Sequence, residues 1–147
     1  MYKILSKIGL SVLFYSNSVF GTNLNCIENE KLVLTCSKTA KNNTQVQETE
    51  LIFCARKDAD EKAILSLVTS QKLHAELDQN KIDFRYNDLA RNGFMSKSFD
   101  TLDKSSITVT ITPELEADWK ISLTRESANG DFTDLGQLKY TCEQNEP

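Results

Sequence analysis

The sequence has few of the residues from which catalytic and metal centres are usually built. It contains one histidine, His74, and its four cysteines include no Cys-x-x-Cys pair. Zinc sites need closely spaced Cys or His ligands, and dithiol redox sites need two neighbouring cysteines, so neither kind of site is indicated. The five glycines are scattered singly, which leaves no Gly-rich loop to hold a phosphate group. We therefore predict no catalytic residue, no metal site and no cofactor, and we expect a protein that is not an enzyme.

Basic residues are also in short supply. The 147 residues include 17 Lys and Arg against 21 Asp and Glu, which gives a net charge of −4 and an isoelectric point near 5.1. Domains that bind nucleic acid usually present a basic face, so a nucleic-acid partner is not expected. The hydrophobic content of 39% is too high for a disordered acidic chain. The length indicates one folded domain.

Residues 1–21 have the three parts of a secretory signal. Lys3 and Lys7 provide a positive start, residues 8–15 form an apolar core, and residues 19–21 precede a cleavage site at Thr22. Neither this stretch nor any later one reaches the roughly 20 apolar residues of a membrane-spanning helix. We expect residues 22–147 to form a single exported domain without a membrane span, either secreted or periplasmic. The alternatives are a buried N-terminal helix and an uncleaved anchor.

Most of the expected domain alternates apolar and polar residues with period two, as half-buried strands do. The clearest segments are 107–112 and 119–124, which predict a hairpin because Pro113 ends the first of them. Further strands are expected at 32–36, 51–55, 73–77, 82–86 and 138–142, with a weaker candidate at 94–102. The pattern predicts an all-β fold, a small antiparallel meander of eight or nine strands closed as a barrel or a sandwich. Closure would also protect the edges of the sheet.

Residues 58–70 fit two kinds of element. Asp58 followed by Glu61 is typical of the start of a helix, and Ala63, Ile64 and Leu67 would share one helical face, so a short helix near 58–68 is one interpretation. The Ser, Val and Thr residues of 64–69 favour a strand instead. We prefer the strand.

Four cysteines remain after residue 21, an even number that predicts two disulfides in an exported domain. Strand parity selects among the three possible pairings. Cys36 lies an even number of residues from Leu32 and shares its apolar face, and Cys142 lies on the apolar face of the last strand. Cys54 lies on the opposite face from its apolar neighbours. We therefore predict a Cys36–Cys142 bond inside the domain and a Cys26–Cys54 bond outside it.

Residues 87–94 form the longest irregular stretch between expected strands. They carry Leu89, Arg91 and Phe94, and loops on a rigid scaffold are frequent binding sites, so we predict that these three residues bind a partner. The alternative is that Leu89 and Phe94 only cover one end of a barrel. His74 alternates outward from its neighbours, which predicts an exposed strand residue with no catalytic role.

These features favour a non-catalytic, exported binding module that acts on a macromolecular partner, such as an inhibitor of an enzyme. Its partner would be a protein or a component of the cell envelope. One alternative is a carrier with a small molecule in the barrel interior. Phe84, Tyr86, Trp119 and Tyr140 are numerous enough to fill a small barrel, which counts against that cavity. A hydrolase that uses two carboxylates is the third hypothesis and has the least support.

Overall fold

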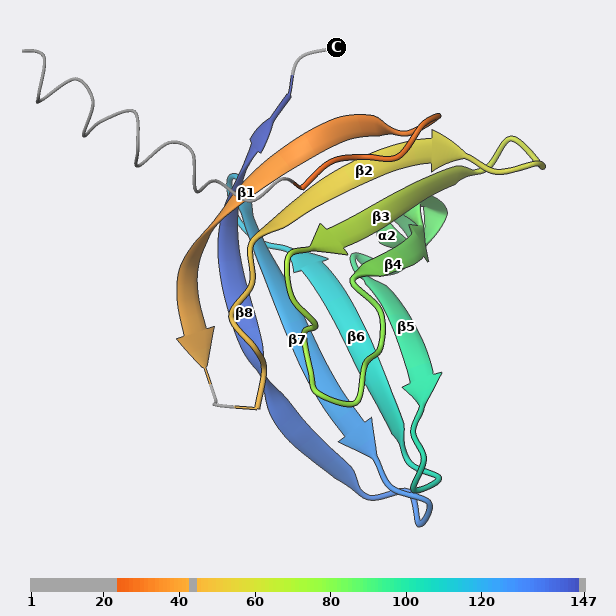
Figure 1. The fold of residues 1–147 in the computed structure, drawn as a ribbon, viewed down its shortest axis with the longest axis vertical. Helices are drawn as coiled ribbons and strands as arrows, with labels where there is room; N and C mark the ends of the chain where they lie inside the picture. Colours follow the sequence, from red (N-terminus) through yellow and green to blue (C-terminus); the bar gives the residue numbers. More distant parts are fainter. Residues whose placement is uncertain (1–23, 43–44, 146–147) are drawn as a thin grey trace, which may run out of the picture.

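The structure, a computed structural model, describes residues 24–42 and 45–145. Eight strands and one short helix follow one another along this part of the chain (Figure 1). The elements are β1 (Lys31–Asn42), β2 (Leu51–Lys57), β3 (Ala63–Thr69), β4 (Lys81–Arg85), α2 (Tyr86–Asn92), β5 (Met95–Asp100), β6 (Ser106–Pro113), β7 (Asp118–Glu126) and β8 (Phe132–Gln144). The expected signal segment, residues 1–21, lies outside the described residues.

The strands form one antiparallel sheet with the order β4-β3-β2-β1-β8-β7-β6-β5. β1 pairs with β2 on one side and with β8 on the other, so the first and last strands of the chain are neighbours. β4 and β5 are the two edges of the sheet, and they lie side by side, connected by α2 (Figure 1). The sheet is therefore a nearly closed barrel, and the prediction of an all-β antiparallel meander is confirmed.

Because successive strands run in opposite directions, the links between them alternate between the two ends of the barrel. One end, which we call the closed end, carries the links 45–50, 70–80, 101–105 and 127–131. The other end, which we call the open end, carries the turns 58–62 and 114–117, helix α2, residues 24–30 and residue 145. The two longer links of the closed end are 45–50 and 70–80, and the open end has one link of comparable length, which contains α2.

The core lies inside the barrel and follows from the period-two pattern. Ile107, Val109 and Ile111 on β6 are completely buried, and Val109 and Ile111 pair with Leu123 and Ile121 on β7 in the ladder. Burial of an aliphatic side chain of this size contributes about 1.5–3 kcal/mol relative to an exposed one. The hairpin predicted from residues 107–112 and 119–124 is confirmed, as is the strand predicted at 64–69.

The strand predicted at 73–77 is wrong, because this segment is part of the link 70–80. Leu73 and Leu77 are both buried, and a turn brings the Leu77 N–H to the His74 carbonyl at 3.0 Å. The segment pairs with the other long link at one point, where the Gln47 N–H donates to the Leu73 carbonyl at 2.8 Å. His74 is 7% exposed, so its predicted outward position is also wrong.

The prediction of an irregular segment at 87–94 is wrong, and the alternative of a short helix near 58–68 is not found either. Residues 87–94 are not irregular, since most of them belong to α2, which Gly93 ends with a left-handed φ of 75°. The helix considered near 58–68 is absent from this described part of the chain. Its expected capping residue, Asp58, instead accepts hydrogen bonds from the backbone N–H groups of Asp60 and Lys62, both at 2.9 Å, and so stabilises the tight turn into β3.

The Cys36–Cys142 disulfide joins β1 to β8. The two residues are direct partners in the ladder and both are buried, and the bond links positions 106 residues apart. This is the interior pair that strand parity predicts. The bond holds together the two strands whose pairing turns the meander into a barrel.

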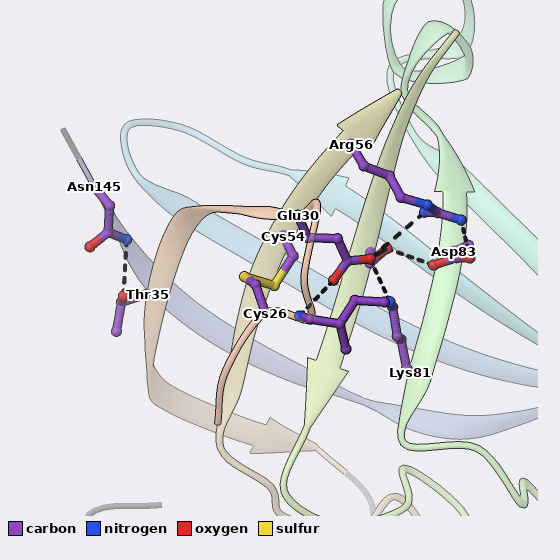
Figure 2. The surroundings of a disulfide bond; sticks show 10 residues. Cys26, Glu30, Thr35, Cys54, Arg56, Lys81, Asp83 and Asn145 are labelled. Atoms are coloured by element: carbon purple, nitrogen blue, oxygen red, sulfur yellow. Dashed lines mark hydrogen bonds and ion pairs between the residues drawn. A yellow bond between two sulfur atoms is a disulfide. The ribbon is translucent and has the colours of Figure 1, made fainter. Parts of the chain in front are cut away.

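The Cys26–Cys54 disulfide lies on the outside of the sheet and attaches residues 24–30 to β2 (Figure 2). Cys54 is nevertheless completely buried. The parity argument places Leu32 on the same apolar face as Cys36, and this placement is wrong. A bulge between Leu32 and Leu34 shifts the register, so Leu32 pairs with Cys54 and is 36% exposed, whereas Leu34 packs against the core.

The attached segment buries one carboxylate on the outer face of the sheet. The Glu30 side chain is 0% exposed and forms ion pairs with Lys81 on β4 and, at 3.8 Å, with Arg56 on β2 (Figure 2). It also accepts a hydrogen bond from the Ile27 N–H at 3.2 Å, and its Oε1 lies 3.4 Å from the Ser66 hydroxyl oxygen. A buried carboxylate with this many partners is stable only while all of them remain in place.

Asp83 completes this charged cluster from β4. It accepts hydrogen bonds from the Ser66 hydroxyl at 2.6 Å and from Arg56 Nη2 at 2.8 Å. Burial alone would raise the pKa of the Asp83 carboxyl, but these bonds and the nearby positive charges outweigh it and hold the pKa below its ordinary value. The carboxylate is therefore ionised at neutral pH.

Replacing both cysteines of one disulfide by alanine tests how much that disulfide contributes to the stability of the barrel. In the chain-entropy relation a loop of about 107 residues corresponds to about 5 kcal/mol, and the shorter loop between Cys26 and Cys54 to about 3.5 kcal/mol. We expect the Cys36→Ala/Cys142→Ala variant to lose more stability in urea unfolding than Cys26→Ala/Cys54→Ala. The opposite order would mean that β1 and β8 stay paired without their bond.

Glu30→Ala should lower the free energy of unfolding by about 2–3 kcal/mol, because it leaves Lys81 and Arg56 without their shared carboxylate. Glu28→Ala, at an exposed position of the same segment, should change it by less than about 0.5 kcal/mol. Urea titration of both variants provides the comparison. Equal losses would show that the buried ion pairs contribute nothing.

Candidate functional site

The open end of the barrel contains a cavity of about 1000 Å³. Strands β1, β2, β3, β6, β7 and β8, helix α2 and the turn 114–117 contribute to it, whereas β4 and β5 do not. The bordering residues are Val33, Leu34, Ala55, Ala63, Ile64, Leu65, Tyr86, Leu89, Pro113, Glu116, Ala117, Trp119, Cys142, Glu143, Gln144 and Asn145. Most of these side chains are apolar, and the polar ones come mainly from the turn 114–117 and the end of β8.

Trp119 borders the cavity next to the core. It lies near the start of β7, packs against Phe53 with ring centroids 5.2 Å apart, and is half-buried. It is the only tryptophan in the sequence. The indole therefore connects the packed interior to the cavity surface, and it is a built-in fluorescent reporter of this region.

The aromatic residues do not fill the barrel as the sequence predicts. Phe84 and Tyr140 are buried in the core. Tyr86 begins α2 and is 48% exposed, and Trp119 forms part of the cavity border, so the expectation of a filled interior is wrong at the open end. Because Tyr86 belongs to a helix, it does not continue the alternation of β4.

The closed end differs because its two long links fold over the core. They contribute the fully buried Val46 and the buried Leu73 and Leu77. The Tyr140 hydroxyl donates a 2.6 Å hydrogen bond to the Thr49 carbonyl, which fixes the first link to β8. Burial raises the pKa of this hydroxyl well above its ordinary value, so it stays protonated and can donate. This end of the barrel is therefore covered, and the mouth of the cavity lies at the other end.

Of the three residues predicted to bind a partner, the structure places one at the cavity. Leu89 of α2 borders it, while Arg91 and Phe94 do not, although both are exposed. The Gly93 N–H donates to the Leu89 carbonyl at 2.9 Å, so the helix ends directly after the residues that face the cavity. Sequence analysis missed the bordering residues of β1 and β3, including Val33 and Ile64. The up-and-down order of the strands places these residues at the same end of the barrel as Leu89.

A second cluster of charged residues lies at the closed end. Arg125 on β7 forms ion pairs with Glu76 at 2.6 Å and with Asp103 at 3.5 Å. Hydrogen bonds from Ser105 and Thr101 lower the pKa of Asp103 to about 2. The cluster connects the link 70–80 to the turn 101–105. Residues 24–42 and 45–145 contain no group of three His, Cys, Asp or Glu side chains that could hold a metal ion.

Comparison with known proteins gives no relative: no family model, curated protein or solved structure matches this chain. Among the described residues, no helix has the length and apolar character required to cross a membrane. The two disulfides are consistent with an oxidising compartment.

His74 makes the closed end sensitive to pH. Burial lowers the pKa of its imidazole from the ordinary 6.5, with Glu76 opposing and Arg125 adding to the shift, so the folded protein favours the neutral ring. Its Nδ1 accepts the Glu76 N–H at 3.2 Å, which also requires the neutral form. The stability that His74 contributes is complete above pH 6.5 and is lost as the pH falls toward the folded pKa.

We expect the Tm of the protein to fall between pH 7 and pH 5.5. In His74→Asn, which retains an acceptor at a similar place, this fall should be smaller because the unfolded state gains no extra proton there. Calorimetry of both proteins at the two pH values measures the difference. Equal slopes would show that His74 titrates alike in the folded and unfolded states.

Proposed function

We propose that the protein is a non-catalytic binding protein of an exported type, secreted or periplasmic, and that the cavity at the open end is its binding site. The observation that carries this proposal is the apolar cavity of about 1000 Å³ in a disulfide-tied barrel whose other end is covered. Ligand sites commonly have volumes of about 300–1,000 Å³, mostly apolar walls and a few polar groups. This geometry favours the carrier hypothesis over the filled barrel that the sequence indicated.

A small apolar molecule is the occupant that the walls favour. Val33, Leu65, Leu89 and Trp119 offer aliphatic and aromatic surface, and each CH₂ group of a ligand buried against them contributes about 0.8 kcal/mol. The floor is formed by the packed core, so the ligand enters a preformed site with little loss of protein conformational entropy. The residues around the cavity give no support for a catalysed reaction, so we do not propose a hydrolase.

A macromolecular partner, a protein or an envelope component that the domain inhibits or captures, is the second candidate. Two exposed apolar side chains at the open end favour it. Leu115 in the turn 114–117 is 87% exposed, and Tyr86 is 48% exposed beside the mouth. Tyrosine is enriched in the centres of interfaces, and such a partner would place an apolar side chain in the cavity.

Native mass spectrometry of the protein purified from its own host distinguishes the two candidates. A retained mass of a few hundred daltons supports the carrier. A complex with a defined second macromolecule, disrupted by Leu115→Ser and Tyr86→Ser, supports the partner.

Ala55→Phe tests the cavity as the binding site. Ala55 borders the cavity from β2 and is half-buried, so a phenyl ring in its place would occupy ligand space. We expect the affinity for the uncharged fluorescent probe N-phenyl-1-naphthylamine to fall at least about tenfold, or about 1.4 kcal/mol. Ala128→Phe, an exposed position in the turn 127–131 at the closed end, is the matched control and should bind the probe like the unaltered protein. Unchanged affinity in Ala55→Phe would place the site elsewhere.

A further inference from the structure

The charged residues around the mouth of the cavity indicate which class of ligand the cavity would bind. Among the residues that border the cavity, the charged ones are two carboxylates, Glu116 in the turn 114–117 and Glu143 near the end of β8. Both are exposed. Neither has an ion pair with a described cation. The border includes no Lys, Arg or His within the part of the chain that the structure describes.

Two other glutamates at the same end form ion pairs within the protein. Glu114 lies 3.7 Å from the Lys120 ammonium and 3.6 Å from that of Lys139, and Glu61 pairs with Lys57 at 3.3 Å. Glu116 and Glu143 thus carry negative charge at the mouth without an ion-pair partner among the described residues. The chain as a whole is acidic, which adds to the negative potential there.

We propose that the ligand of the open end is a cationic amphiphile, a molecule with an apolar body and a positively charged head group. This inference rests on the proposed function. The body occupies the space between Trp119, Leu89 and the neighbouring aliphatic side chains, and the head group stays at the wet mouth near the two carboxylates. A cation in that position keeps its hydration and gains attraction, whereas an anionic head group would meet repulsion. The charge complementarity selects this occupant over a fatty acid or another anionic lipid.

The test uses three probes with the same ten-carbon chain and different head groups. They are decyltrimethylammonium, decyl sulfate and the uncharged decyldimethylphosphine oxide, each titrated below its micelle concentration. Fluorescence of Trp119 reports binding directly, and a Trp119→Phe variant provides the background. We expect the cation to bind about three- to tenfold more tightly than the uncharged probe and the anion to bind least, because exposed charge pairs contribute modestly. The preference should decrease between 20 mM and 500 mM salt.

Two sets of variants assign the preference to the mouth. Glu116→Gln/Glu143→Gln should bring the cation and the uncharged probe to within about twofold of each other, while affinity for the uncharged probe stays the same. Glu126→Gln, an exposed glutamate at the end of β7 on the closed side, removes a charge away from the cavity and should leave the preference intact.

The outcomes separate this inference from the proposed function. Equal or tighter binding of the uncharged probe or the sulfate would overturn the cationic ligand but leave an apolar binding site. A cation preference that survives in Glu116→Gln/Glu143→Gln would also overturn it, because the attraction would then come from elsewhere. Absence of binding by all three probes would overturn both the inference and the proposed carrier.

Discussion

The pairing of β1 with β8 is the constraint on which the rest of the structure depends. Without it, the strands would form two separate four-stranded sheets, because β4 and β5 form no ladder with each other. With it, residues at the two ends of the chain become neighbours, and Cys36 and Cys142 meet as partners in the ladder. The entropy of closing so long a loop opposes this pairing, and the covalent bond removes most of that cost from folding. The same two strands supply Leu34 and Cys142 to the cavity border.

Much of this fold could be predicted from period-two alternation, because each residue on a barrel strand faces either the core or the solvent. The β6–β7 hairpin and the disulfide pairs depend only on that rule. It fails where alternation arises without a neighbouring strand, as between Leu73 and Leu77, whose shared direction comes from a turn. The rule also fails at Leu32. A bulge adds one residue to β1, so Leu32 and Leu34 lie on opposite faces although they are two residues apart.

The candidate site was harder to predict. A cavity forms where side chains leave space unfilled, and strand alternation does not show where that happens. Leu89 was identified as a binding residue from its place between strands, although it belongs to a helix rather than a loop. The period-two pattern predicts that Trp119 points inward, and its ring packs against Phe53, but it is only half-buried and borders the cavity. The up-and-down order of the strands determines which residues lie together at the open end. The residues that border the cavity can be identified in this way only once the pairing of β1 with β8 is known.

The junction between β4 and β5 gives the barrel a mechanical property. The other seven neighbouring pairs of strands are held by continuous backbone ladders, which resist both sliding and separation. At the remaining junction the described residues form no ladder, and the two edges are connected by α2 and by side-chain packing. The elastic compliance of the wall is therefore concentrated along one line. Separation of β4 from β5 beside α2, which carries Leu89 at the cavity border, would break no backbone hydrogen bond of a ladder.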